Sequence, residues 1–192
     1  MGTAIGRTRS DSLIEIRRLR EDDAEAMRKL RREALEREPA SFGESVTEFL
    51  QLSSNAIAAR LGDSSNENFI FGAFDADSLV GMAGFFREQR EKRRHKGTVW
   101  GVYVSTNYRG KGVARAIMTA LLDAVRELPG LVCVYLTVTS SNAAASKLYR
   151  SLGFRGFGTE PRALAVDGEF FDEEHMVLFT DPAHNVTGRG RV

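Results

Sequence analysis

Apolar residues in the first third of the chain follow a strand spacing and then a helical one. The run Leu13–Arg17 predicts a short strand, and acidic residues at 21–23 predict a helix start because carboxylates stabilise the positive end of a helix dipole. The apolar face of that helix recurs at steps of three, seven and eight residues, at Met27, Leu30, Ala34 and Leu35. Pro39 ends it. A second helix is predicted from Ser45, whose spacing from a later glutamate fits a capping box, to Leu61.

Strand patterns dominate the rest of the chain. The predicted elements are, in order, strands at 68–74, 79–86 and 98–104, a helix at 109–128, a strand at 131–138, a helix at 143–152, and strands at 154–159 and 174–179 flanking a turn at 166–169. This order predicts an α/β protein with one mixed sheet. We assign 13–180 to a single domain. Residues 1–12 and 181–192 are polar and aperiodic, which predicts flexible tails.

Composition narrows the class of protein. A length of 192 residues suits one domain, and 42% hydrophobic with 28% charged residues is typical of a folded globular chain. The formal net charge of +1 gives no reason to expect nucleic acid as a partner. One cysteine, Cys133, excludes an internal disulfide and suits a reducing compartment. No long apolar stretch or secretory signal is present, so we expect a cytoplasmic protein without membrane contact.

Two further features concern anion and metal binding. The connection Arg87–Lys96 holds six basic residues mixed with two glutamates, which favours a solvated hairpin loop over an anion-binding or nucleic-acid surface. The histidines His175 and His184 have no companions at metal-ligand spacing, so no metal is expected.

The segment 101–114 is the most informative for chemistry. A predicted strand runs into the glycine-rich turn Arg109–Ala114, which opens a helix. Free backbone N–H groups and the helix dipole make such a turn a site for the phosphates of a nucleotide or cofactor. The turn is neither a P-loop nor a Gly-x-Gly-x-x-Gly motif, because Arg115 holds the third glycine position of the latter.

This turn resembles the Arg/Gln-x-x-Gly-x-Gly/Ala signature of the GNAT superfamily of acetyl-CoA-dependent N-acetyltransferases. A second segment, Asn142–Phe154, is similar to the family's Asn-x-x-Ala…Tyr…Gly-Phe element, and the resemblance extends over 13–180. It implies a GNAT fold, whose mostly antiparallel mixed sheet is splayed at the cofactor site. It also implies acetyl transfer from acetyl-CoA to a primary amine, of a small molecule, a peptide or a protein, by direct attack in a ternary complex. Dimers are common in the family, but no interface can be identified from this sequence.

The resemblance assigns roles to particular residues. Tyr149 aligns with the general acid that protonates the CoA thiolate, and the Val102 N–H would polarise the thioester carbonyl. An amphipathic core tyrosine is the alternative interpretation of Tyr149. The positions that would bind the cofactor are Val102, Tyr103, Val104, Arg109, Gly110, Lys111, Gly112, Val113, Ala114 and Asn142.

The general base and the acceptor stay open. Thr98 stands where several members of the family have a glutamate, and it cannot act as a base; this supports the alternative of a CoA-binding sensing module without catalysis. Candidate bases, directly or through water, are Glu44, Glu88, His95 and Glu173. Candidate acceptor-binding residues are Phe42, Glu44, Asp172 and Glu173. The last two belong to an acidic cluster, Asp167, Glu169, Asp172, Glu173 and Glu174, which is either a lip for a cationic acceptor such as a polyamine, an aminoglycoside or an amino terminus, or a solvated hairpin.

Overall fold

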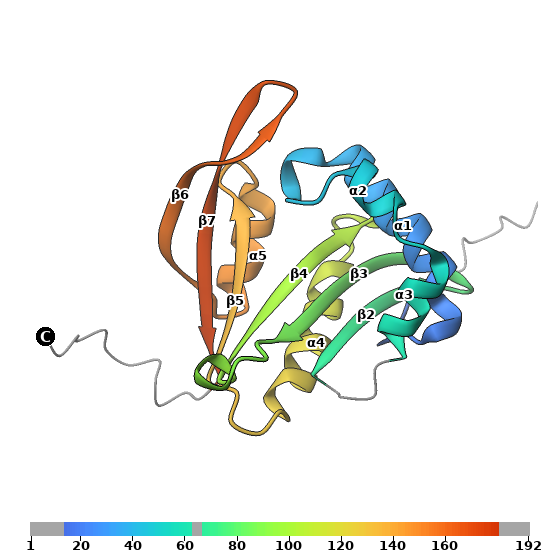
Figure 1. Cartoon of the computed structure of the whole chain (residues 1–192), viewed down its shortest axis with the longest axis horizontal. Coiled ribbons are helices and arrows are strands. Elements are labelled where there is room, and N and C mark those ends of the chain that lie inside the picture. Colours follow the sequence, from blue (N-terminus) through green and yellow to red (C-terminus); the bar gives the residue numbers. More distant parts are fainter. Residues whose placement is uncertain (1–13, 63–66, 181–192) are drawn as a thin grey trace, which may run out of the picture.

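The computed structural model describes residues 14–62 and 67–180, which form a seven-stranded sheet with helices on both faces (Figure 1). The strands are β1 (Glu15–Arg18), β2 (Asn68–Asp75), β3 (Ser78–Arg87), β4 (Lys96–Val104), β5 (Cys133–Thr139), β6 (Arg155–Val166) and β7 (Glu169–Phe179). The helices are α1 (Ala24–Arg37), α2 (Val46–Leu50), α3 (Ser54–Leu61), α4 (Val113–Arg126) and α5 (Ala143–Ser151). The tails predicted at 1–12 and 181–192 lie outside the described residues.

The sheet has the order β1-β2-β3-β4-β5-β7-β6, and only β4 and β5 pair in parallel. The other five strand pairs are antiparallel, which confirms the prediction of a mixed, mostly antiparallel sheet. No helix in the described part of the chain has the length and apolar character needed to cross a membrane.

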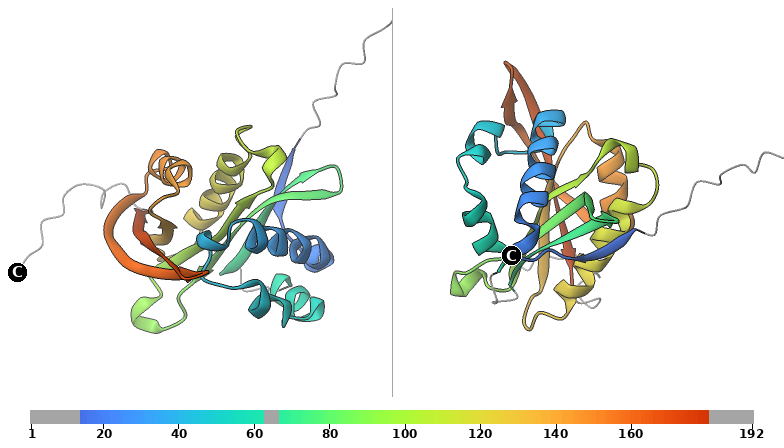
Figure 2. Two further views of the ribbon diagram at one scale, coloured as in Figure 1. Left: turned by 90° about the horizontal axis from the view of Figure 1, so that it is seen from above. Right: turned by 90° about the vertical axis from the view of Figure 1, so that its right-hand side faces the viewer.

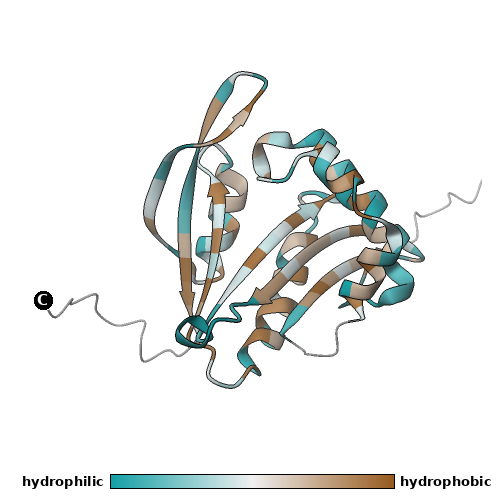
Figure 3. Ribbon diagram, in the orientation of Figure 1, coloured by the Kyte–Doolittle hydropathy of each residue, from teal (hydrophilic) through white to brown (hydrophobic). Residues whose placement is uncertain are grey.

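Two apolar clusters hold the helices against the sheet. The helix α4 packs on one face through side chains such as Ile117 and Leu121, and α1 packs on the other face through the stripe that the sequence predicts. Figure 2 shows helices on either side of the sheet, and Figure 3 shows mostly hydrophobic positions along β2 and β3 but a mixture of hydrophilic and hydrophobic positions along β6. The helical spacing at the sequence level therefore identifies the buried faces correctly.

The helix predicted from Ser45 to Leu61 is wrong in one respect, because the chain forms two helices there. The capping box at Ser45 is present, with the Glu48 N–H donating to the Ser45 hydroxyl at 3.2 Å. The helix α2 ends at Leu50, and the Ser53 hydroxyl accepts from the Ala56 N–H at 3.2 Å to begin α3. A serine that caps a new helix competes with continuation of the old one.

The helix predicted to begin at Arg109 begins instead at Val113. Gly110 and Gly112 have φ angles of +73° and +80°, a left-handed conformation that a right-handed helix cannot contain. The closing strands are longer than predicted, because β6 and β7 continue to a two-residue turn at Asp167–Gly168, with φ angles of +50° and +85°. Their pairing is interrupted between Glu160 and Leu164.

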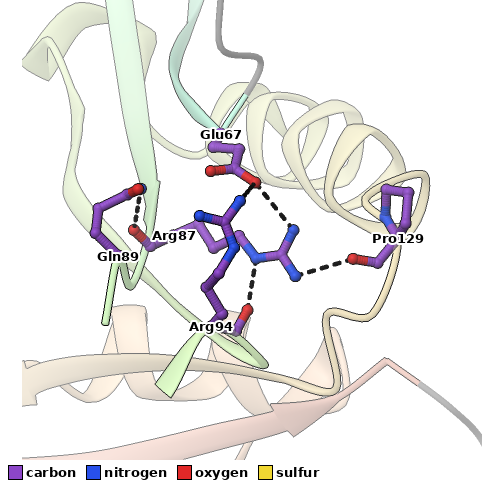
Figure 4. Close-up of polar contacts among 5 residues, drawn as sticks. All are labelled: Glu67, Arg87, Gln89, Arg94 and Pro129. Carbon is purple, nitrogen blue, oxygen red and sulfur yellow. Dashed lines mark hydrogen bonds and ion pairs between the residues drawn. The ribbon is translucent and has the colours of Figure 1, made fainter. Parts of the chain in front are cut away.

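Arg87, the first residue of the basic connection Arg87–Lys96, has a structural role that the prediction of a solvated loop did not include. Arg87 is buried, and its guanidinium donates to the Glu67 carboxylate at 3.1 Å, to the Pro129 carbonyl at 2.9 Å and to the Arg94 carbonyl (Figure 4). It thereby joins β3, the loop after it and the loop after α4. The basic residues between Arg87 and Lys96 are exposed, as expected for a solvated loop, although Arg93 pairs with Glu88 at 2.8 Å.

Candidate active site

A large cleft opens where β4 and β5 separate. The two strands pair only at Lys96↔Cys133, Gly97↔Val134 and Thr98↔Tyr135, and beyond these pairs they diverge (Figure 1). The cleft between them has a volume of about 1120 Å³ and reaches from the N-terminus of α4 to the loop after α1. The unpaired strand edges leave backbone N–H and C=O groups for a ligand to bind.

A bulge in β4 accompanies this separation. The pairs Met82↔Tyr103 and Gly84↔Trp100 leave Gly101 and Val102 opposite Ala83 of β3, so β4 carries one extra residue. Gly101 has a φ angle of +62°, the conformation of the glycine in a G1 bulge. Such a bulge changes the direction of the neighbouring N–H groups, and it does so at the residue expected to polarise the thioester carbonyl.

The glycine-rich turn forms one end of the cleft. Gly110, Gly112, Val113 and Ala114 all line the cleft, and Gly112 is the N-cap of α4 without a side-chain hydrogen bond. A Cβ atom at either glycine would meet nothing within 4 Å, so the backbone there faces open space. The free N–H groups and the positive end of the helix dipole make this end of the cleft suited to an anion.

The basic side chains of the turn are engaged with the protein. Arg109 Nε donates to the Val104 carbonyl at 2.9 Å, and Arg109 Nη1 pairs with Glu38, just after α1, at 2.8 Å. Lys111 lies over the Tyr108 ring at 5.4 Å. Arg109 thus ties the turn to the end of α1, and the backbone N–H groups of the turn are left facing the cleft.

Asn142 and Tyr149 stand on the α5 side of the cleft. Asn142 is the N-cap of α5, and its Oδ1 accepts from the Ala145 N–H at 3.1 Å, which leaves its Nδ2 group to donate to a ligand. The Tyr149 side chain is 6% exposed and packs edge-on against Phe154, with ring centroids 6.1 Å apart. Burial raises the pKa of Tyr149 above its ordinary value, so its hydroxyl keeps its proton at neutral pH.

The acceptor candidates separate into two groups. Phe42 and Glu173 line the cleft, as does Thr98. Glu44 instead binds Arg31 at 2.9 Å and lines a second cavity, and the Asp172 carboxylate accepts from the Arg162 N–H at 2.8 Å away from the cleft lining. Of the acidic cluster, only Glu173 lines the cleft.

The candidate bases are divided in the same way. Glu88 lines the cleft but is paired with Arg93, and His95 lies outside the cleft lining. Glu173 lines the cleft without a salt bridge to any described residue. Of the four candidate bases, Glu173 is therefore the one that both lines the cleft and has no ion pair with a described residue.

The acetyltransferase (GNAT) family matches residues 24–154. The chain belongs to the GNAT family. The family's fold agrees with the structure: a GNAT acetyltransferase from Streptococcus pneumoniae superposes with a TM-score of 0.78 at 24% identity, over 87% of this chain and 99% of that one. YncA of Salmonella typhimurium, solved with its cofactor acetyl-CoA, gives 0.75 at 22% identity, over 88% and 95%.

Relatives within the GNAT family act on different amines. The chain is 38% identical over 104 residues to the N-alpha-acetyltransferase RimI of Mycobacterium tuberculosis, covering 54% of this chain and 63% of RimI. It is 29% identical over 117 residues to the L-amino acid N-acetyltransferase AaaT of Escherichia coli, covering 61% and 71%. A match of 38% identity to the uncharacterized protein ML0378 of Mycobacterium leprae covers 53% of this chain and 27% of that protein. The chain thus spans less than two thirds of two of these relatives.

Arg31 and His175 line the cleft but were not predicted as site residues from the sequence. Arg31 lines it from α1, and its position four residues after Met27 within an apolar stripe was the signal that could have revealed a buried charge. His175 lines it from β7 and lies 3.0 Å from Glu160 of β6. The sequence gives no sign of the His175–Glu160 contact, because it joins residues of two different strands. Among residues 14–62 and 67–180, no three His, Cys, Asp or Glu side chains are grouped to hold a metal ion.

Proposed function

We propose that this protein is an N-acetyltransferase that transfers the acetyl group of acetyl-CoA to a primary amine by direct attack in a ternary complex. The observation that carries the proposal is the cleft between β4 and β5, which joins the uncapped N-terminus of α4 to the buried hydroxyl of Tyr149. Residues 13–180 form the catalytic domain in this proposal.

The cofactor would lie along the cleft. Backbone N–H groups of 110–114 would bind its pyrophosphate, because no side-chain cap occupies them. The open edge of β4 at Val102 and Val104 would pair with the pantetheine amides as a strand does, and Asn142 would donate its Nδ2–H from the other wall. The Val104 carbonyl is already taken by Arg109, which leaves Val102 as the stronger partner.

Each residue then has one chemical task. Val102 donates its N–H to the thioester oxygen as the amine nitrogen attacks the carbonyl carbon and negative charge develops on that oxygen. As the carbon–sulfur bond breaks, Tyr149 transfers its proton to the leaving sulfur. Glu173, directly or through water, accepts the proton that the acceptor ammonium group must lose before its nitrogen can attack as a neutral amine. The second proton lost from that nitrogen, as the tetrahedral intermediate collapses, restores the Tyr149 phenol. The products are the acetylated amine and free CoA.

A CoA-binding module without catalysis is the alternative, and Thr98 is the residue that favours it. The discriminating experiment is release of the CoA thiol from acetyl-CoA across amino acids, peptides, polyamines and aminoglycosides, with a control lacking amine. Release that depends on an amine is the expected result. No release with any amine, together with tight acetyl-CoA binding by calorimetry, would refute the enzyme and support the sensing module.

A further inference from the structure

A buried cation stands in the wall of the cleft. Arg31 of α1 is 5% exposed, and with Trp100 it separates the cleft from a second, more apolar cavity of about 610 Å³ under α1–α3. Its Nε and Nη2 donate to one Glu44 oxygen at 3.2 and 2.9 Å. Its Nη1 is buried and has no hydrogen-bond partner among the described residues. One corner of the guanidinium is therefore unsatisfied.

That corner points toward the β4 bulge. Nη1 lies 3.6 Å from the position a Cβ atom would take at Gly101, the residue before Val102. The Phe42 ring, which lines the cleft, lies over the guanidinium with its centroid 4.5 Å away, and the Trp100 ring lies at 6.0 Å. The unsatisfied N–H groups are thus next to the proposed site of acetyl transfer, under an aromatic cover.

Packing alone gives no reason for a charge at this position. Arg31 lies among apolar side chains of α1 such as Met27 and Leu35, and an apolar residue of similar volume there is commonly as stable as a buried ion pair. Desolvation lowers the pKa of the Arg31 guanidinium despite the Glu44 carboxylate, which is itself partly exposed. A buried cation with unpaired donors is costly, and a second anion satisfies it with charge-assisted hydrogen bonds.

We propose that Arg31 binds a carboxylate of the acceptor, so that the acceptor is an α-amino acid or another amine with a carboxylate close to the reacting nitrogen. The inference rests on the proposed function and specifies its substrate class. Because Nη1 is buried, a carboxylate reaches it only if a covering side chain moves, and we infer that this is the Phe42 ring, which lies over the guanidinium and lines the cleft. Polyamines, and peptides whose amino terminus has no neighbouring carboxylate, leave the donors unpaired, and sites built for a polar group discriminate against ligands lacking it.

The first test uses the wild-type protein and acceptors matched in size. L-phenylalanine is compared with phenethylamine, and spermidine and an alanine-terminated peptide amide complete the set. We expect kcat/KM for L-phenylalanine to exceed that for phenethylamine by at least about tenfold, equivalent to about 1.4 kcal/mol. Equal values, or a preference for the amine without a carboxylate, overturn the proposal.

The second test uses Arg31→Met, Arg31→Lys and the control Arg32→Met, an exposed neighbour that pairs with Glu36 at 2.7 Å. Arg31→Met should lower kcat/KM for the amino acid by about tenfold or more and leave phenethylamine within about twofold, with partial recovery in Arg31→Lys. Arg32→Met should change neither. If Arg31→Met lowers both acceptors equally and weakens acetyl-CoA binding, Arg31 is structural and the proposal fails.

Calorimetry separates this inference from the proposed function. L-phenylalanine is titrated into the CoA-saturated wild type and into Arg31→Met. Binding by the wild type that is lost in the variant supports the carboxylate site even if no amine is acetylated. Turnover of phenethylamine or spermidine without amino-acid binding overturns the carboxylate site but leaves the proposed acetyltransferase activity standing. If L-phenylalanine does not bind and no amine is acetylated, both proposals are overturned.

Discussion

Tyr149→Phe tests the chemistry most directly, because the structure separates its catalytic contribution from its packing. The ring is buried against Phe154, and desolvation is the cause of the raised pKa of Tyr149. Among residues 14–62 and 67–180 the hydroxyl has no charged or hydrogen-bonding partner to lose. Removing it should change the free energy of unfolding by no more than about 0.5 kcal/mol. The fold and the cleft therefore survive the substitution.

The catalytic loss should be large. A positioned general acid contributes about 10²- to 10⁴-fold, so kcat should fall by that factor, or about 2.7 to 5.4 kcal/mol in activation free energy. Affinity for acetyl-CoA should stay within about twofold, because its phosphates are expected at the N-terminus of α4. The assay is thiol release at saturating substrates, with calorimetry for the cofactor.

The matched control is Tyr108→Phe, which removes a hydroxyl from another tyrosine of the same cleft. That hydroxyl donates to Asp75, the last residue of β2, at 2.6 Å, so kcat should change by less than about threefold. If Tyr149→Phe keeps its kcat within the range of this control, the hydroxyl takes no part in the reaction and Tyr149 is a core residue.

The remaining predictions concern stability and cofactor binding. Gly112→Ala places a side chain at a φ angle of +80°, which should cost about 1–2 kcal/mol and raise the KM for acetyl-CoA, whereas Gly158→Ala, in open space, should be neutral in urea unfolding. Arg87→Ala leaves the Arg94 and Pro129 carbonyls without their donor, although Glu67 keeps its ion pair with Arg94, and should lower the free energy of unfolding by about 1–3 kcal/mol; a loss under about 0.5 kcal/mol in urea titration would contradict this. Burial, with a smaller contribution from Cys133, raises the pKa of Tyr135 to about 12. Because unfolded tyrosine ionises near pH ~10, the folded state retains a proton that the unfolded state releases, and stability should fall by up to about 1.4 kcal/mol per pH unit between about pH 10 and 12. Tyr135→Phe should reduce that slope, and an unchanged slope would refute the assignment.

Sequence patterns predicted the elements well wherever a buried face repeats. The stripe of α1 and the apolar run of β5 depend on burial against the sheet, which local spacing records directly. The glycine-rich turn was also recognisable, because left-handed φ angles at Gly110 and Gly112 require that residue type.

Features that depend on distant partners were not predictable. The surroundings of Arg31 could not be predicted, because Glu44, Phe42 and the bulge at Gly101 come together around it only in the folded protein. The buried role of Arg87 depends on a carbonyl 42 residues away. Exposed strands such as β6 were shortened in the prediction, because an exposed strand lacks the alternation that burial imposes.

The interruption in β6 has a consequence for solubility. This strand is at the edge of the sheet and is exposed along most of its length, an arrangement that invites another copy to add a strand. A formal net charge of +1 provides little long-range repulsion between molecules. Pro161 removes a backbone donor in the interruption, and Arg162, with a φ angle of +54°, bends the strand out of a flat edge. Resistance to fibrous self-association at high concentration thus depends on these two local irregularities and not on the charge of the whole protein.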